Sequence, residues 1–199
     1  MASFAPSSIL LFGATGNIGR HITNSILESN PPFKRVVVFT SPNTVASKDS
    51  LLSAWKAKGL EVAVGDLTQD DDVQDAYRGI DTVISCVGRS VLDRQIRLLT
   101  LAEESPGVQW FFPSEYGTDI NFSPASASEK PHQVKLSVRK HIRDKIHRLK
   151  YTYLVTGPYA DMWFNPSPGA DAGGYTVEKK TASVIDDGNG RIGLITMKE

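Results

Sequence analysis

Short apolar runs alternate along the chain with longer segments in which apolar residues recur every three or four positions. Six such runs, rich in β-branched, aliphatic and aromatic residues, occupy residues 8–13, 35–40, 60–66, 81–88, 108–114 and 151–157. They are apolar almost throughout instead of alternating with polar residues, which is typical of strands buried on both faces of a parallel sheet. The pattern therefore predicts six strands.

The segments between these runs have the spacing of amphipathic helices. Residues 66–81 also offer acidic residues for a helix start and Gly79 for its end. Apolar residues mark one face in three further segments: Ile18, Ile22 and Ile26; Leu92, Ile96 and Leu99; and Val134, Val138, Ile142 and Ile146. Strands alternating with helices predict an α/β fold with a doubly wound parallel sheet.

Two segments fall outside this alternation. The Pro-, Ser- and Ala-rich residues 121–131 are predicted to form an unusually long loop, which suggests a functional segment. Near the end of the chain, the sequence predicts a hairpin around Asp187–Gly190.

Composition narrows the classes of function. The chain has 199 residues, of which 40% are apolar, and its 22 basic residues balance its 22 acidic ones. Such a balance gives no reason to expect nucleic acid or a membrane as partner, so a small-molecule substrate is favoured. Cys86 is the only cysteine, and no apolar stretch approaches a membrane span or signal segment. We expect a cytoplasmic protein, and because the four histidines lack metal-ligand spacing, no metal.

Three glycines stand where the first predicted strand meets the first helix. In "FGATGNIGR", Gly13, Gly16 and Gly19 are spaced by three residues. A turn of this kind lets the backbone approach a pyrophosphate at a helix N-terminus. The sequence thus predicts a dinucleotide site formed by Gly13, Ala14, Thr15, Gly16, Asn17, Ile18 and Gly19. The alternative is a strand-to-helix turn without a ligand.

The end of the second strand bears on the choice of dinucleotide. An NAD site usually carries an acidic residue there to bind the ribose 2′-hydroxyl. Here Thr40 and Ser41 take its place, followed by Lys48, with Arg20 as a weaker candidate on the first helix. Without a repelling carboxylate, Ser41 and Lys48 favour the 2′-phosphate of NADP(H). Lys48 is equally well interpreted as a solvated loop lysine.

Later strand ends supply the remaining candidates for cofactor binding. Ligands of open α/β sheets lie outside the carboxyl ends of the strands. Asp66 is therefore expected beside the adenine, although an aspartate there can simply cap the next helix. Cys86, Val87 and Gly88 are expected beside the ribose. Ser114 is either part of a nicotinamide pocket or a turn serine.

Several motifs together resemble a known family. "GATGNIGR", "VGDL", "VISCVG", "FFPSEYGTD" and "KLSVRKHI", followed by "YTYLVTGPYADMWF", are similar to the NmrA-like and isoflavone reductase-like group, which includes phenylcoumaran benzylic ether reductases. The group belongs to the atypical short-chain dehydrogenases. The resemblance implies a Rossmann domain over residues 1–160, a partial, truncated substrate-binding lobe over residues 161–199, and a monomeric or homodimeric NADPH-dependent reductase of a small aromatic or phenolic compound.

Within this resemblance, Lys135 takes the position of the family's catalytic lysine and is also expected to contact the cofactor. On a helix that buries Val134, Val138 and Ile142, it lies about 100° from that stripe, at the edge of the buried face. An ammonium there would stabilise or protonate the oxygen formed after hydride delivery. The alternative is a solvated lysine, because this helix is rich in basic residues. The pocket walls are expected from Tyr116, Tyr159, Met162 and Trp163.

Two features leave other interpretations open. Tyr175 and Lys179 have the spacing of the catalytic pair of ordinary short-chain dehydrogenases, but they follow the sixth strand, so we interpret them as a coincidence. Members of the family usually carry arginine where this chain has Ser41.

The alternative function is an NmrA-like redox sensor that binds the dinucleotide without catalysis.

Overall fold

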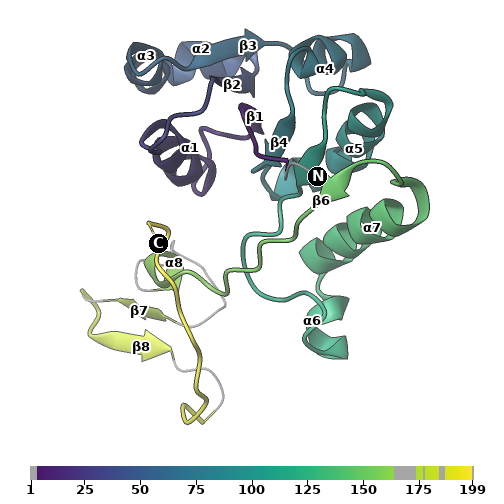
Figure 1. The fold of residues 1–199 in the computed structure, drawn as a ribbon. Coiled ribbons are helices and arrows are strands. Elements are labelled where there is room, and N and C mark those ends of the chain that lie inside the picture. The colour runs from purple at the N-terminus through teal and green to yellow at the C-terminus, as the bar shows by residue number, and fades with distance from the viewer. Residues whose placement is uncertain (1–3, 164–173, 177, 184–186, 199) are drawn as a thin grey trace. The chain divides into compact units, whose positions relative to one another are not determined.

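The chain folds into two compact units. The computed structural model describes residues 4–163, 174–176, 178–183 and 187–198 (Figure 1). The first unit comprises residues 1–115 and 120–154, and the second comprises residues 116–119 and 155–199.

The first unit is built on a parallel sheet of six strands. These are β1 (Ser8–Phe12), β2 (Arg35–Thr40), β3 (Glu61–Val64), β4 (Thr82–Ser85), β5 (Trp110–Phe112) and β6 (Lys150–Tyr151). Their order in the sheet is β3-β2-β1-β4-β5-β6, and every neighbouring pair is parallel. This is the strand order of the dinucleotide-binding Rossmann fold, in which the direction of winding reverses between β1 and β4. The predicted fold class is confirmed.

The two edge strands differ from their prediction. Glu61 and Val64 of β3 are exposed, because this strand has a neighbour on one side only and is not buried on both faces as the sequence suggested. β6 has only two residues, and the chain leaves the sheet before Leu154, which is 49% exposed. The apolar content of residues 151–157 therefore does not reflect a long buried strand.

Helices cover both faces of the sheet. In β1, alternate side chains enter different cores: Ile9 and Leu11 pack in one cluster and Leu10 and Phe12 in the other. The first cluster receives α1 (Gly19–Leu27) and α3 (Asp49–Ala57), and the second receives α4 (Asp70–Tyr77), α5 (Gln95–Glu104) and α7 (Lys130–Lys145). The sheet is therefore wound on both sides. The shorter helices are α2 (Pro42–Ser47), the 3-10 helix η1 (Arg89–Arg94) and α6 (Pro124–Ser128).

The segment predicted as a long loop contains a helix. Ser123 accepts a hydrogen bond from the Ser126 amide at 3.1 Å, and Pro124 occupies the first turn of α6. A serine cap followed by proline favours a helix start. Residues 121–131 thus form one short helix and the beginning of α7, and the prediction of a loop was wrong there.

The second unit contains α8 (Ala160–Trp163) and an antiparallel pair, β7 (Gly174–Thr176) and β8 (Thr181–Ser183). Around Asp187–Gly190, where the sequence predicted a hairpin, the chain forms a turn in which the Asn189 amide donates to the Asp187 carboxylate at 2.9 Å. Residues 184–186, just before this turn, lie outside the described part of the structure, so strand pairing across it stays a prediction. Ile195 pairs with Tyr159 in an isolated bridge.

Arg148 joins the end of α5 to the connection between α7 and β6. Its guanidinium donates to the carbonyl oxygens of Ala102 (2.6 Å), Glu103 (2.9 Å), Ser105 (3.1 Å) and Val108 (2.6 Å). Ala102 and Glu103 lie in the last turn of α5, whose carbonyls have few partners within the helix, and Ser105 and Val108 follow it. The carbonyls of Ala102 and Ser105 also accept hydrogen bonds from the amides of Ser105 and Val108. The side chain thus closes the helix and holds the strand that follows.

We expect Arg148→Met to lower the free energy of unfolding by about 1–2 kcal/mol, since several hydrogen bonds from a partly exposed charge are lost. Urea denaturation measures the change. Arg143→Met, an exposed arginine on α7, is the matched control and should leave stability almost unchanged. Equal effects of the two substitutions would contradict this role of Arg148.

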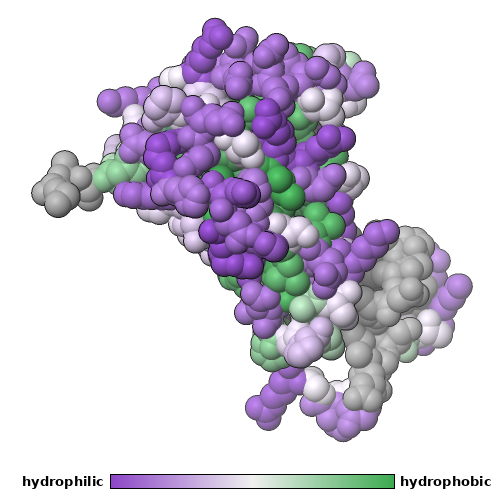
Figure 2. All heavy atoms as spheres, turned by 90° about the vertical axis from the view of Figure 1, so that its right-hand side faces the viewer, coloured by the Kyte–Doolittle hydropathy of each residue, from purple (hydrophilic) through white to green (hydrophobic). Residues whose placement is uncertain are grey.

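The surface is mixed in character. Hydrophilic side chains cover most of the side that carries α7, with hydrophobic ones visible between them (Figure 2). In the part of the chain that the structure describes, no helix has the length and apolarity needed to cross a membrane.

Candidate functional site

The turn from β1 into α1 requires glycine at two positions. Gly13 has a φ of +70°, and a Cβ built on it would lie 2.4 Å from the carbonyl oxygen of Cys86. A Cβ on Gly19 would lie 2.2 Å from the carbonyl oxygen of Gly13. Any other residue would therefore separate β1 from the end of β4, or α1 from the turn itself.

The N-terminus of α1 suits an anion. Its N-cap, Ile18, provides no side-chain hydrogen bond, and no acidic residue occupies the first turn. The amides of Arg20 and His21 donate to the carbonyls of Gly16 and Ile18, so the amides that could face an anion belong to the turn before them, and the helix dipole makes this end positive. A phosphate group suits this positive end, so the residues present fit the pyrophosphate of a dinucleotide.

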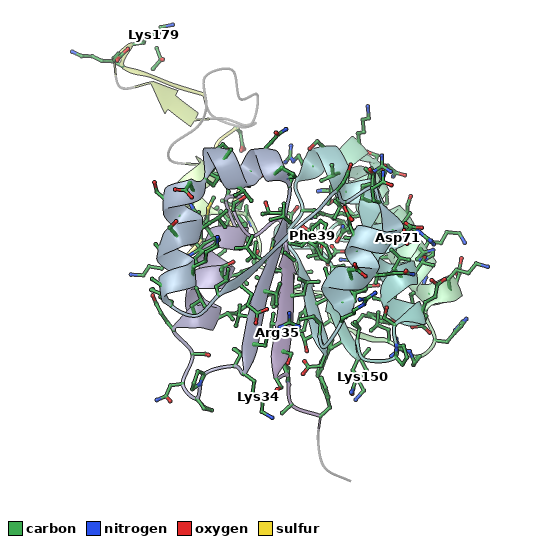
Figure 3. The ribbon with its side chains drawn as sticks, turned by 90° about the horizontal axis from the view of Figure 1, so that it is seen from above. Lys34, Arg35, Phe39, Asp71, Lys150 and Lys179 are labelled. Atoms are coloured by element: carbon green, nitrogen blue, oxygen red, sulfur yellow. The ribbon has the colours of Figure 1, made fainter. Side chains whose placement is uncertain are left out.

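A cleft of about 730 Å³ opens at the carboxyl ends of β1, β2, β3 and β4. Phe39, near the end of β2, lies among the interior side chains, whereas Lys34 and Lys150 lie at the edge of the unit (Figure 3). The lining consists of Phe12, Gly13, Ala14, Thr15, Phe39, Thr40, Ser41, Pro42, Asn43, Thr44, Gly65, Asp66, Leu67, Thr68, Val87, Gly88, Ser90, Val91, Asp93 and Arg94. This is the edge at which open α/β sheets bind their ligands.

Not every residue that the sequence analysis proposed for the cofactor contributes to this lining. Seven of them do: Gly13, Ala14, Thr15, Ser41, Asp66, Val87 and Gly88. The others lie outside it: Gly16, Asn17, Ile18, Gly19, Lys48, Cys86, Ser114 and Lys135. Of these, Gly16, Asn17 and Ile18 belong to the turn that leads into α1, and Gly19 begins this helix.

The end of β2 is occupied by a helix cap. The Ser41 hydroxyl accepts a hydrogen bond from the Thr44 amide at 3.3 Å and lies 3.1 Å from the Thr44 hydroxyl. Lys48 is exposed where α2 meets α3. The structure thus brings Ser41 to the cleft with its hydroxyl already used by α2, and it places Lys48 outside the described lining.

Asp66 faces the cleft and does not cap α4, whose N-cap is Gln69. Its carboxylate accepts hydrogen bonds from the Thr68 amide and hydroxyl, both at 2.8 Å. These two bonds, aided by the charge of Arg94, hold the pKa of Asp66 below its usual range. The capping alternative is therefore wrong, and Asp66 is an ionised group on the cleft.

Ser114 connects the ends of two strands. Its hydroxyl donates to the Val87 carbonyl at 3.0 Å, and its amide donates to the Gln95 side chain at 2.7 Å. Val87 itself lines the cleft. Ser114 therefore holds the segment after β5 against the segment after β4. It does not line the cleft itself but contacts Val87, which does.

Lys135 lies at the edge of the buried face of α7 and is partly buried. Its Nζ donates to the carbonyl oxygen of Glu115 at 2.8 Å. Burial lowers the pKa of Lys135. The charge of Glu115 raises this pKa, whereas the charges of Arg139 and Arg89 lower it further. An ammonium of this kind releases its proton more readily than a solvated lysine does.

A buried ion pair stands directly beside Lys135. Arg139, one helical turn further along α7, donates to the Glu115 carboxylate at 2.9 Å and 3.0 Å, and the two side chains are 8% and 1% exposed. The Arg139 guanidinium also lies 4.7 Å from the ring centre of Tyr153. Burial raises the pKa of Tyr153 to about 12, and its hydroxyl has no hydrogen-bond partner among the described residues.

The residues expected to wall the substrate pocket belong to the second unit. Tyr159 is buried and its hydroxyl accepts a hydrogen bond from Thr156 at 2.8 Å, whereas Met162 is 51% exposed. Tyr116 begins the short stretch 116–119 of the same unit. The side chain of Trp163 lies outside the described part of the structure. A pocket formed by these four residues remains a prediction.

Sequence reasoning missed three charged residues of the site. Arg94 stands at the end of η1, and nothing in its spacing marks it as part of a cleft. Glu115 lies in the "FFPSEYGTD" motif and Arg139 follows Lys135 by four residues, which was the available signal that they share a side of α7. Among the described residues, no group of three histidine, cysteine, aspartate or glutamate side chains is placed to hold a metal ion.

Comparison with known proteins gives one family. The model of the NmrA-like family matches residues 5–167. A phenylcoumaran benzylic ether reductase of Pinus taeda is 30% identical over 187 residues, which make up 94% of this chain and 59% of that protein. The chain thus spans about three-fifths of the length of this curated relative.

Solved structures of related enzymes share the fold. A crystal structure of isoflavone reductase superposes with a TM-score of 0.75 at 23% identity, covering 98% of this chain and 62% of that one. The binary complex of leucoanthocyanidin reductase with NADPH from Vitis vinifera gives a TM-score of 0.74 at 21% identity, covering 96% and 61%.

Proposed function

Because the chain belongs to the NmrA-like family, we propose that it is an NADPH-dependent reductase of a small aromatic or phenolic compound. The observation that carries the proposal is Lys135, a partly buried ammonium in the same unit as a cleft that suits a dinucleotide. The relatives described above are named as reductases, and one neighbouring structure contains NADPH. Residues 1–160 would bind the cofactor, and residues 161–199 would form part of a substrate lobe.

In this proposal the glycine turn and the first turn of α1 bind the pyrophosphate. Gly13, Ala14 and Thr15 line the cleft there, and Asp66 faces the adenine side. Val87 and Gly88 border the ribose, with Ser114 supporting Val87 through its hydrogen bond. Bound NADPH supplies the hydride. From the sequence, Lys48 stays a candidate cation for the phosphate, to be compared with the cation on the cleft lining, and Tyr116, Tyr159, Met162 and Trp163 stay the candidates for the substrate.

Lys135 provides the proton. Reduction of an electrophilic carbon leaves negative charge on an oxygen, and an ammonium held beside it stabilises this charge or donates a proton. The Glu115 carbonyl fixes the direction of Nζ, and burial brings its pKa closer to the working range.

The proposal includes a cytoplasmic location and a monomeric or homodimeric state.

The proposal is tested by titrating the protein with NADPH and NADH and following nicotinamide fluorescence. We expect tighter binding of NADPH, because no carboxylate at the end of β2 repels a 2′-phosphate. Ser41→Asp should weaken NADPH binding about tenfold or more through like-charge repulsion, with a smaller effect on NADH. Ser47→Asp, on the far end of α2, is the control. A preference for NADH by the unmodified protein would contradict the choice of cofactor.

Activity is tested by screening phenylpropanoid-like ethers and enones for oxidation of NADPH. Turnover of any of them would support the reductase. Tight binding of NADPH with no turnover across the screen would instead favour the redox sensor.

A further inference from the structure

The charge of the cleft poses a problem for a 2′-phosphate. Among its described lining residues, the charged side chains are Asp66, Asp93 and Arg94. Their formal sum is negative by one, counting two carboxylates against one guanidinium. A 2′-phosphate adds between one and two further negative charges near neutral pH. Binding of NADPH therefore needs a cation that faces the cleft.

The end of β2 does not supply this cation. Its residues on the lining are Thr40, Ser41, Pro42, Asn43 and Thr44, all uncharged, and the Ser41 hydroxyl caps α2. Lys48 and Arg20 are exposed and lie outside the described lining.

Several cations elsewhere in the first unit lie far from the cleft or are already paired. Lys34 and Arg35 stand at the amino end of β2, and Lys150 begins β6 at the edge of the unit (Figure 3). The six residues of β2 separate its two ends by roughly 16–17 Å, so Lys34 and Arg35 cannot reach the carboxyl edge. Arg97 is paired with Asp70.

Arg94 is the cation that the described lining of the cleft contains. It is exposed at the end of η1, and within the described residues its guanidinium forms no ion pair within bonding distance. Arg94 lines the same cleft as Asp66, and its charge is the weakest of the influences on the lowered pKa of Asp66. Asp66 is itself fixed by its two hydrogen bonds to Thr68. The arginine is thus attracted toward the adenosine end of the cleft but is free to accept a stronger anion.

We propose that Arg94 binds the 2′-phosphate of NADPH and so replaces the cation that the end of β2 lacks. This assignment rests on the proposed function and adds to it the residue that selects the phosphorylated cofactor. A planar guanidinium donates two parallel hydrogen bonds to phosphate oxygens, which makes arginine well suited to this contact. Arg94 lines the cleft together with Asp66, so its guanidinium has access to the adenosine end.

The test compares Arg94→Gln with the unmodified protein in fluorescence titrations with NADPH and NADH. We expect the dissociation constant for NADPH to rise about tenfold or more and that for NADH to change less than threefold, because only NADPH carries the 2′-phosphate. Competition by 2′,5′-ADP should weaken in parallel, whereas competition by 5′-AMP should not. The NADPH affinity of the variant should also depend less on salt.

Two matched variants control the test. Arg97→Gln removes an arginine from the neighbouring helix that is paired with Asp70 and lies outside the described lining, so it should leave both affinities unchanged. Lys48→Gln tests the rival cation. Loss of NADPH selectivity in Lys48→Gln but not in Arg94→Gln would overturn the assignment, and so would an equal loss of both nucleotides in Arg94→Gln. Failure of the unmodified protein to bind either nucleotide would overturn the proposed function itself.

Discussion

Replacing Lys135 by alanine is expected to remove most turnover while leaving NADPH affinity within a few-fold. Lys135 lies outside the described lining of the cleft, so it is not needed to hold the phosphates. Its Nζ donates to the Glu115 carbonyl at 2.8 Å, and in the proposed mechanism this contact orients it for proton transfer. General acid catalysis typically contributes about 10² to 10⁴ in rate. Steady-state rates with a substrate from the screen, together with NADPH titrations, measure both quantities.

Lys140→Ala is the control for this substitution. Lys140 lies on the same helix, its side chain is 70% exposed, and it pairs with Asp144 four residues away. A pair of this kind contributes little to stability, and Lys140 has no assigned role. We expect nearly normal rates from Lys140→Ala. Equal activity in the unmodified protein and in both variants would show that Lys135 is not the proton donor.

The pH dependence of the rate gives a second check on Lys135. A proton donor is active in its protonated form, so the rate should fall as pH rises through its pKa. Burial lowers this pKa below that of an ordinary lysine, and the nearby cations Arg139 and Arg89 add to the effect against the attraction of Glu115. The fall should therefore begin at lower pH than for a solvated lysine. A rate that stays constant up to the usual lysine range would contradict the assignment.

The sheet was predictable because its signal is local. β1, β2 and β4 are nearly uninterrupted apolar runs, and each is followed by a segment with helical spacing. Their burial on both faces requires this pattern, so the fold class could be inferred without any tertiary information. β6 could not be delimited, because its apolar continuation leaves the sheet, and α6 was missed because a five-residue helix shows no periodicity.

The site was predictable only where backbone geometry dictates the residue. At Gly13 and Gly19 there is no space for a Cβ, so these positions require glycine, and this requirement is visible in the sequence itself. No comparable constraint identifies Arg94 or Arg139 in the sequence, because arginine is usually solvated. The partner of Arg139 comes from another segment of the chain, and so do most residues that line the cleft with Arg94. Glu115 and Arg139 are 24 positions apart, so only the fold shows that they meet.

The Glu115–Arg139 pair yields the second large prediction. We expect Arg139→Met to lower the free energy of unfolding by about 3–5 kcal/mol, because it leaves a carboxylate that is 1% exposed without its partner. Methionine retains much of the apolar volume of the arginine stem beside Tyr153, so the change acts mainly on the charge. Urea denaturation followed by circular dichroism measures the loss.

Two further variants separate charge from packing. Arg143→Met makes the same substitution at an exposed position of α7 and should change stability by less than about 0.5 kcal/mol. The double variant Glu115→Gln with Arg139→Met removes both charges, and it should be more stable than Arg139→Met alone because no buried charge is left unpaired. Two results would contradict this role of the pair: Arg139→Met lowers the free energy of unfolding no more than Arg143→Met does, or adding Glu115→Gln to Arg139→Met restores no stability. Either would show that the pair does not hold the segment after β5 to α7. In that case the position of the Glu115 carbonyl, and with it the direction of Lys135 Nζ, must depend on the apolar contacts of Val138 and Ile142 in the core.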